Sequence, residues 1–334
     1  MSLTVPTLDI VIVNWNSGDQ LRECLASVAA SDRRGIELQR VVVVDNASSD
    51  GSVDKLEFPL LPVTVIKNEI NRGFGAACNR GTRGSNADYI LFLNPDARVN
   101  PDTLAASVQF MESAAAHDVG IASVKLIDES GHTSRCCSRF PTLKILCGKM
   151  FGLNLVLPKY FPDQFYIEWD HNSSREVEQV QGAYLLMRRA LFEALRGFDE
   201  CFFVYLEDVD LGLRARQTGW KSYHYAGTEA FHAGGGTSRQ IKARRLFYSL
   251  QSRLLYAAKH FSTASAVCLF LATLLVEPFS RVFFSLIKGS FREIVHTIQA
   301  YGMLYAALPR LRKVAHTRQS DVAATSARTE AVPE

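Results

Sequence analysis

The sequence lacks the cysteine patterns that hold disulfide frameworks or structural zinc sites together. Its seven cysteines are an odd number, and no two of them have Cys-x-x-Cys spacing. This usage is typical of a reducing compartment and argues against both kinds of site. The N-terminus also lacks a basic segment followed by an apolar one, so no signal peptide is expected. We therefore expect a cytoplasmic protein.

Acidic residues are scarce in the last third of the chain. Residues 239–318 carry 13 Lys and Arg but only two acidic side chains, Glu277 and Glu293, whereas residues 1–238 carry 23 basic and 29 acidic side chains. A basic, apolar segment behind an acidic body is typical of contact with an anionic membrane surface or a phosphorylated ligand. The chain has no basic–aromatic recognition module, so nucleic acid is not an expected partner.

The sequence has no uninterrupted apolar run of about 20 residues, the length that an α-helix needs to cross a bilayer. Ala264–Val276 has no charge but is too short, and it is followed by an acidic residue, a proline and the apolar run Phe279–Ile287, broken only by Arg281. We expect a helical hairpin lying in the membrane interface. The alternative is an apolar helix pair packed on the body of the protein or on another subunit.

Apolar runs of strand length alternate with helical segments in the first half of the chain. Strands alternating with helices predict an α/β fold with a doubly wound, mostly parallel sheet. The expected strands are Leu8–Asn14, Arg40–Val44, Val63–Lys67, Tyr89–Leu93, Gly120–Leu126, Glu178–Met187 and Ser222–Ala226. The expected helices are Gly18–Ala30, Gly75–Arg83, Pro101–Ala116, Asp208–Thr218 and Gln240–His260.

Polar side chains follow three of the expected strands. Asn14, Asp45 and Asp96 each stand at or just after the carboxyl end of a buried run. In doubly wound sheets ligands bind beyond these ends, so the three side chains point to one site. Taken singly, each could instead be an ordinary strand cap or turn residue.

Asp96 and His232 are the candidate metal ligands. A carboxylate exposed just after a buried strand suits a divalent cation with oxygen ligands. His232 stands two residues before three consecutive glycines, a position that by itself is more often structural. Those glycines allow a ligand to approach the backbone closely, and Lys242 belongs to a basic stretch beyond them that suits a diphosphate.

The stretch NRGFGAACNRG, Asn71–Gly81, has glycines but not the spacing of a dinucleotide-binding fingerprint. It offers backbone N–H groups at a helix start and a cation, Arg72, and both favour phosphate. Asp45 could accept a hydrogen bond from the imide N–H of a base. These features together describe a nucleotide-diphosphate site with a metal.

Three carboxylates, Glu207, Asp208 and Asp210, follow the apolar run Phe202–Leu206. One of them would serve as general base for an attacking hydroxyl. On a helix, Asp208 and Asp210 point about 200° apart, so they would not share one proton. Asp210 is then a cap or the ion-pair partner of Arg214. The alternative is an acidic helix start that the helix dipole favours.

At this point the motifs carry a family resemblance. The chain resembles the family-two inverting glycosyltransferases of the GT-A fold, and most of all bacterial rhamnosyltransferases that build O-antigen or other cell-surface polysaccharide. The matching stretches occur in the same order over roughly residues 8–260: DIVIVNWNS, VVVVDNASSDGS, NRGFGAACNRG, LFLNPD, GAYLLMRRALFEALRGFDECFFVYLEDVDLGLRARQTGW and FHAGGGTS. The resemblance implies a sugar nucleotide donor, a Mg²⁺ or Mn²⁺ ion and inversion at the anomeric carbon.

The resemblance also implies roles for single residues. Asp208 matches the catalytic base, with Glu207 as the neighbour that positions it or the acceptor. Asn94-Pro95-Asp96 stands where the family has Asp-x-Asp; because Asn94 replaces the first acid, Asp96 must carry most of the metal binding, with His232 as a further ligand. The residues expected to bind the nucleotide sugar are Asn14, Asp45, Asn71, Arg72, Gly73, Asn79, Asn94, Asp96, Gly182 and Lys242.

We expect an enzyme that transfers L-rhamnose from dTDP-rhamnose to a polyprenol-linked or glycan acceptor, peripheral on the inner face of the cell membrane. Another UDP- or dTDP-sugar donor, a nucleotidyltransferase and a non-catalytic nucleotide-sugar-binding scaffold are the alternatives. Residues 1–238 are expected to form the catalytic domain, 239–318 a helical region for membrane association or oligomerisation, and 319–334 a disordered tail. The irregular segment 128–172 is either a substrate-facing insertion or a packing lid.

Overall fold

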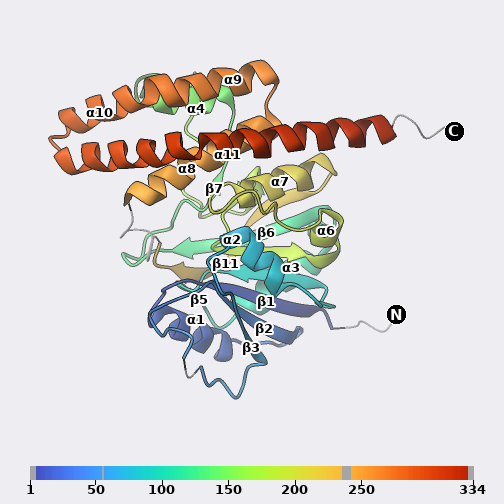
Figure 1. Cartoon of the computed structure of the whole chain (residues 1–334). Coiled ribbons are helices and arrows are strands. Elements are labelled where there is room, and N and C mark those ends of the chain that lie inside the picture. Colours follow the sequence, from blue (N-terminus) through green and yellow to red (C-terminus); the bar gives the residue numbers. More distant parts are fainter. Residues whose placement is uncertain (1–4, 55, 235–241, 330–334) are drawn as a thin grey trace. The chain divides into compact units, whose positions relative to one another are not determined.

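The computed structural model describes residues 5–54, 56–234 and 242–329, with side chains described up to residue 311 (Figure 1). The chain divides into two compact units. Unit 1 contains residues 1–140, 164–203 and 207–239, and unit 2 contains residues 141–163, 204–206 and 240–334. The division near residue 239 lies close to the expected domain boundary, whereas the two short internal pieces of unit 2 were not anticipated.

Unit 1 is built on a mixed sheet whose nine strands all lie within the described residues. Their order is β3-β2-β1-β4-β10-β6-β11-β5, with β8 paired to β11. The strands are β1 Thr7–Asn14, β2 Glu37–Asp45, β3 Val63–Lys67, β4 Tyr89–Leu93, β5 Ala97–Val99, β6 Val119–Ile127, β8 Arg175–Val177, β10 Tyr184–Arg188 and β11 Lys221–His232. A two-stranded sheet pairs β7 Cys137–Ser138 with β9 Gln179–Val180.

The centre of the sheet aligns the carboxyl ends of its strands. β1 pairs in parallel with β2 and with β4, and Asn14 stands opposite Asp45 in this register. The side chains of β4 are all buried, as its continuous apolar sequence predicts for a strand covered on both faces. The predicted doubly wound sheet is confirmed, and β10, part of the predicted strand Glu178–Met187, runs antiparallel between β4 and β6.

The predicted strand Glu178–Met187 is two strands, β9 and β10, separated by residues 181–183. Gly182 lies in this break, and its N–H group bonds a side chain of another element rather than a neighbouring strand. The helices of unit 1 are α1 Gln20–Ala29, α2 Phe74–Gly81, α3 Thr103–Glu112, α6 Arg189–Ala194 and α7 Glu207–Gln217, with a 3₁₀ turn at Ala114–Ala116.

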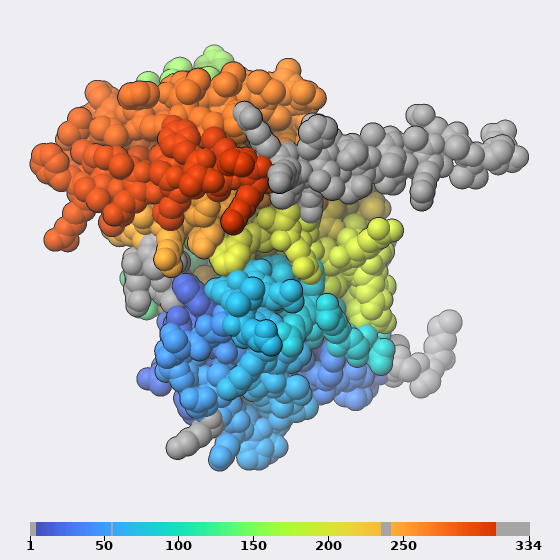
Figure 2. All heavy atoms as spheres, in the orientation of Figure 1, coloured from blue at the N-terminus to red at the C-terminus, as the bar shows by residue number. Residues whose placement is uncertain are grey.

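Unit 2 is helical. Its helices are α4 Leu143–Met150, α5 Leu153–Val156, α8 Lys242–His260, α9 Thr263–Leu271, α10 Glu277–Ile287 and α11 Phe291–Thr329, with a π-helical turn at Ala272–Val276 between α9 and α10. Figure 2 shows α9 and α10 in orange beside the red part of α11. Part of the irregular middle segment thus becomes α4 and α5; α4 packs with α9 and α10, and α5 packs with α4.

The predicted hairpin turn between Ala264–Val276 and Phe279–Ile287 is wrong. The chain continues as one helical segment, Thr263–Ile287. Pro278 stands in the first turn of α10, directly after the π-helical turn Ala272–Val276. The carbonyl oxygen of Leu274, four residues before the proline, accepts from the Tyr305 hydroxyl at 2.7 Å, so the proline does not end the segment. The predicted disordered tail also differs, because α11 continues to Thr329; its alanines at 323 and 324 favour a helix.

Within the described residues, Thr263–Ile287 is a 25-residue helix that is long and apolar enough to cross a bilayer, and most of it is not buried. A core helix of a soluble protein can pass the same test of length and composition, so these two properties do not decide where it lies. Near its middle, Glu277 is 2% exposed and ion-paired with Arg253 of α8 and with Arg281.

Replacing Glu277 by alanine is expected to lower the free energy of unfolding of unit 2 by about 3–5 kcal/mol, because Arg253 would be left buried without its carboxylate. The matched control is Glu293→Ala, which removes the exposed pair with Lys242 and should change the stability by less than about 1 kcal/mol. Denaturant unfolding of the two variants measures the difference. Equal effects would contradict a structural role for the buried pair.

Candidate active site

Asn14 and Asp45 meet at the carboxyl ends of β1 and β2. The amide nitrogen Nδ2 of Asn14 lies 2.9 Å from Asp45 Oδ1 and 2.8 Å from Ser52 Oγ. The Ser17 hydroxyl donates to Asn14 Oδ1. Both Asn14 and Asp45 are buried, so the two strand ends form one polar pair rather than two separate caps. The sequence predicted both residues correctly as neighbours at the rim of the sheet.

Asn46 is a rim residue that the sequence analysis did not include. Its Nδ2 donates to Asn71 Oδ1 at 2.9 Å and to the carbonyl oxygen of Gly73 at 3.0 Å. Its Oδ1 accepts from the backbone N–H of Arg72 at 3.0 Å and from Asn68 Nδ2 at 2.9 Å. Asn46 therefore sets the path of residues 71–73. Its position next to Asp45 was the only signal for it.

Gly73 is required by close packing rather than by phosphate. Its φ is +86°, and a Cβ atom there would lie 2.2 Å from the carbonyl oxygen of Phe203. The same carbonyl accepts from the N–H of Phe74 at 2.8 Å. Two residues on, Gly75 has Glu207 Cβ at 3.7 Å from its virtual Cβ. The first turn of α2 therefore packs against Glu207, the first residue of the acidic stretch.

Asp208 is held by backbone N–H groups at the start of α7. Its Oδ2 accepts from Gly182 at 3.1 Å and its Oδ1 from Val209 at 2.8 Å. Gly182 in turn precedes Ala183, whose carbonyl oxygen accepts from the N–H of Asn94 at 3.0 Å. This short chain of hydrogen bonds connects the proposed base to the end of β4.

Burial controls the acidity of both acids. It raises the pKa of Asp208, although the N–H groups of Gly182 and Val209 oppose the shift. Burial, together with the charge of Asp208, raises the pKa of Glu207 well above its ordinary value. The Oε2 atom of Glu207 is buried and has no hydrogen-bond partner within the described part of the chain. As the pH falls, Glu207 therefore takes up a proton before Asp208 does, and Asp208 remains ionised as a base.

Asp210 has a structural role. It is fully buried and its Oδ2 accepts from Arg214 Nε at 2.8 Å, which confirms the predicted ion pair four residues along the helix. Arg214 also donates to the carbonyl oxygens of Leu195 at 2.7 Å and Gly197 at 2.9 Å. The pair fixes α7 to the loop after α6, so Asp210 is not available as a general base and Asp208 stays the predicted one.

Asn94, Asp96 and His232 converge as the metal prediction requires. β5 and β11 are antiparallel neighbours with Ala97 opposite His232, and this register places the imidazole beside Asp96. His232 Nε2 lies 3.3 Å from Asp96 Oδ1 and 3.4 Å from Asn94 Nδ2. A cavity of about 380 Å³ opens at Asp96. It is lined by Gln20, Glu23, Asp96, Arg98, Glu129, Phe231 and Ala233.

Other predicted site residues lie elsewhere or have other partners. The Asn79 side chain bonds the backbone of Phe198 on both sides, donating to its carbonyl oxygen and accepting from its N–H, each at 2.9 Å. Lys242 belongs to unit 2 and pairs with Glu293. Arg72 is exposed. Gly235 and Gly236 lie outside the described residues.

The comparisons with known proteins decide the family. The model of "Glycosyl transferase family 2" matches residues 9–196. The chain belongs to glycosyl transferase family 2. It is a glycosyltransferase, which sets aside the nucleotidyltransferase and scaffold alternatives.

Two relatives of this glycosyltransferase are rhamnosyltransferases. One is the N-acetylglucosaminyl-diphospho-decaprenol L-rhamnosyltransferase of Mycobacterium tuberculosis, 28% identical over 76% of this chain and 85% of the relative. Another is the rhamnosyltransferase WbbL of Escherichia coli K12, 26% identical over 75% of this chain and 92% of the relative.

A solved structure supports the GT-A fold. The mannosyltransferase PcManGT from Pyrobaculum calidifontis, solved with GDP-Man and Mn²⁺, superposes with a TM-score of 0.52 at 17% identity. The match covers 97% of this chain and 81% of that one. At this identity the likeness concerns the fold alone, and the predicted fold class is confirmed.

Gly73→Ala is expected to reduce glycosyl transfer strongly, because its methyl group would displace the Phe203 backbone four residues before Glu207. The matched control is Gly84→Ala: Gly84 also has a positive φ, of +70°, but nothing lies within 4 Å of its virtual Cβ. Gly84→Ala should lose about 1 kcal/mol of stability through backbone strain, and Gly73→Ala should lose more because the contact with Phe203 is added to the strain. The measurement compares the glycosyl-transfer rates of the two variants at equal folded fraction. An equal loss of rate in both variants would contradict the role of Gly73 in packing.

Proposed function

We propose that the enzyme transfers L-rhamnose from dTDP-rhamnose, with inversion, to a polyprenol-linked or glycan acceptor in cell-surface polysaccharide synthesis. The observation that carries the proposal is the half-buried Asp208 carboxylate, which accepts a hydrogen bond from Gly182 beside the strand end that leads to Asp96. Both curated relatives described above are rhamnosyltransferases, and the name of one specifies a decaprenol-linked sugar. Another UDP- or dTDP-sugar remains the alternative donor, because Asp45 would accept uracil and thymine alike.

The chemistry is a single in-line displacement. Asp208 accepts the proton of an acceptor hydroxyl while the hydroxyl oxygen forms a bond to the anomeric carbon. The bond from that carbon to the diphosphate oxygen breaks, and its electron pair leaves with the nucleoside diphosphate. Glu207, which burial keeps protonated more readily, does not compete for this proton. Asp45 and Asn14 orient the pyrimidine ring of the donor nucleotide at the rim of the sheet.

Asp96 and His232, with Asn94 beside them, fit a divalent cation. Two ligands at about 2.1 Å and at right angles lie about 3.0 Å apart, close to the 3.3 Å between Asp96 Oδ1 and His232 Nε2. A bound Mg²⁺ or Mn²⁺ would stabilise the negative charge of the departing diphosphate. The Asn94 side chain can present its amide oxygen to the ion after a flip.

Asp208→Asn is expected to keep donor affinity within about twofold but to lower transfer about 10²–10⁴-fold, the usual contribution of a general base. A panel of UDP- and dTDP-sugars, assayed with a polyprenol-linked acceptor, identifies the donor. Binding of the donor to each variant by calorimetry separates recognition from transfer.

The control is Glu193→Gln, which removes an exposed ion pair with Arg189 and should leave both quantities unchanged. An Asp208→Asn enzyme with normal transfer would overturn the base assignment. A wild-type protein that binds no UDP- or dTDP-sugar would overturn the donor class.

We further infer that unit 2 binds the surface of an anionic membrane. Val267, Leu271, Leu275, Phe279 and Phe283 are exposed and recur every four residues, so they form one apolar stripe along α9 and α10. The stripe is typical of a helix lying in the interface. A second exposed set on α11 comprises Phe291, Val295 and Ile298.

The charges of unit 2 favour this interfacial orientation over a membrane span. Glu277 lies near the middle of Thr263–Ile287, and a span would carry it and its partner Arg253 of α8 toward the centre of the bilayer. Buried ionic groups there are costly. Lys288 and Arg292 are exposed at the end of α10 and the start of α11, where they can meet lipid phosphates.

Phe279→Glu combined with Phe283→Glu is expected to lower binding to vesicles of anionic lipid at least tenfold, because both side chains are exposed and would meet the acyl region. The control is Leu60→Glu, an equally exposed apolar residue of unit 1. Co-sedimentation with vesicles measures the binding. Wild-type protein that stays in solution with anionic vesicles would contradict the inference.

A further inference from the structure

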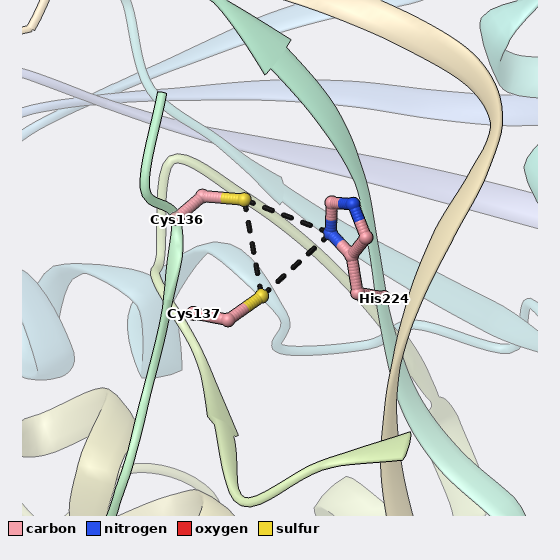
Figure 3. A group of neighbouring side chains, drawn as sticks. All are labelled: Cys136, Cys137 and His224. Carbon is pink, nitrogen blue, oxygen red and sulfur yellow. Dashed lines mark hydrogen bonds between the residues drawn. The ribbon is translucent and has the colours of Figure 1, made fainter. Parts of the chain in front are cut away.

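A second cluster of reactive side chains lies in the core of unit 1. Cys136, Cys137 and His224 are fully buried, and one ligand atom from each lies within 4.8 Å of the others. Figure 3 shows one imidazole nitrogen of His224 facing both sulfur atoms. No part of the glycosyl-transfer mechanism described above uses these residues. His224 belongs to β11, Cys137 begins β7 and Cys136 directly precedes it.

The distances within the cluster match those of a tetrahedral metal site. The two Sγ atoms lie 3.9 Å apart, and His224 Nδ1 lies 3.7 Å from Cys136 Sγ and 3.6 Å from Cys137 Sγ. Around a tetrahedral Zn²⁺ with ordinary bond lengths, sulfur atoms lie about 3.8 Å apart and sulfur and nitrogen about 3.5 Å apart. A point equidistant from the three atoms lies about 2.2 Å from each, which is zinc-bonding distance.

The imidazole of His224 is already in the ligand tautomer. Its Nε2 lies 2.9 Å from the carbonyl oxygen of His171, which can only accept, so Nε2 carries the proton. Nδ1 then presents a lone pair to the two thiols. Metal-binding histidines are commonly fixed by this kind of hydrogen bond from the second ring nitrogen to a backbone carbonyl.

We propose that Cys136, Cys137 and His224 bind one zinc ion in a closed structural site. The sequence argument against such a site relied on the missing Cys-x-x-Cys spacing. Adjacent cysteines and a histidine almost ninety residues later have no recognisable spacing. They meet because β11, which carries His224, pairs with β6, and the last residue of β6, Ile127, forms a bridge with Thr133 shortly before Cys136.

Burial favours an ion that compensates charge at this place. The side chains of Cys136, Cys137 and His224 all have 0% exposure to solvent. A buried thiolate is costly unless a positive charge accompanies it. A zinc ion bound by two thiolates and one neutral imidazole supplies that charge and satisfies all three side chains.

Tetrahedral zinc takes a fourth ligand. His171 lies beside His224 but does not belong to the cluster whose ligand atoms lie within 4.8 Å of one another. Its Nδ1 lies 3.0 Å from the carbonyl oxygen of Trp169, so Nδ1 carries the proton. Its Nε2 is buried and has no hydrogen-bond partner among the residues that the structure describes. The ring centroids of His171 and His224 lie 5.7 Å apart.

The site would stabilise the segment that positions Asp208. The carbonyl oxygen of Cys136 accepts from the N–H of Gln181 at 2.9 Å, and β7 pairs with β9 on the same short segment. Gly182, the next residue, donates to Asp208. A zinc ion joining β7 to β11 would therefore hold the strand from which the Asp208 carboxylate receives its hydrogen bond.

The test is metal analysis of protein purified without metal-affinity chromatography. Wild-type protein is expected to contain about one zinc ion per chain. Cys136→Ser, Cys137→Ser and His224→Gln should each reduce the zinc content to background. The matched control is Cys78→Ala, which removes a buried thiol outside the cluster and should leave the zinc content unchanged.

Cobalt substitution provides a second readout that needs no variant. Wild-type protein refolded with Co²⁺ should show the sulfur-to-cobalt charge-transfer absorption of a thiolate site, and added Zn²⁺ should abolish it. The proposal is overturned if wild-type protein neither contains zinc as purified nor gains it from solution, or if mass spectrometry finds a Cys136–Cys137 disulfide. Neither readout depends on glycosyl transfer, so the result is independent of the proposed function.

Discussion

The hydrogen bond from the Gly182 N–H to Asp208 Oδ2, 3.1 Å long, is the interaction on which the active site depends. It joins the start of α7 to the break between β9 and β10. Because Ala183 next to it accepts from Asn94, the same connection reaches the end of β4 and the candidate metal ligands. The proposed base, the candidate metal ligands and the sheet are thereby joined by hydrogen bonds.

Several local features around Asp208 raise the free energy of the folded state. Tyr205 and Leu206, directly before Glu207, have positive φ values of 69° and 66°, which cost of order 1–3 kcal/mol each. Glu207 is buried, and one of its oxygens has no hydrogen-bond partner among the described residues. The Asp210–Arg214 pair and the close contact of Gly73 with Phe203 oppose these terms by fixing α7 and the backbone before it. Ser252 of α8 also donates to the Val204 carbonyl at 2.8 Å.

The sequence was sufficient where local pattern decides structure. Buried apolar runs located the central strands, and their carboxyl ends located Asn14, Asp45 and Asp96. It was insufficient where distant segments meet. Nothing local indicates that Gly73 must admit the Phe203 carbonyl, or that Cys136 and Cys137 lie beside His224. The hairpin was mispredicted because Pro278 was taken as a break, although the first turn of a helix tolerates proline.

The pKa of Asp208 tests its assignment as general base most directly, and the pH dependence of kcat/KM reports this pKa. A base must be deprotonated, so the rate falls as the pH drops through the pKa of the free enzyme. Because burial raises the pKa of Asp208, the acidic limb should have its midpoint above 3.8, the ordinary value for this group. An acidic limb at or below 3.8, or one that Asp208→Asn leaves unchanged, would contradict the assignment.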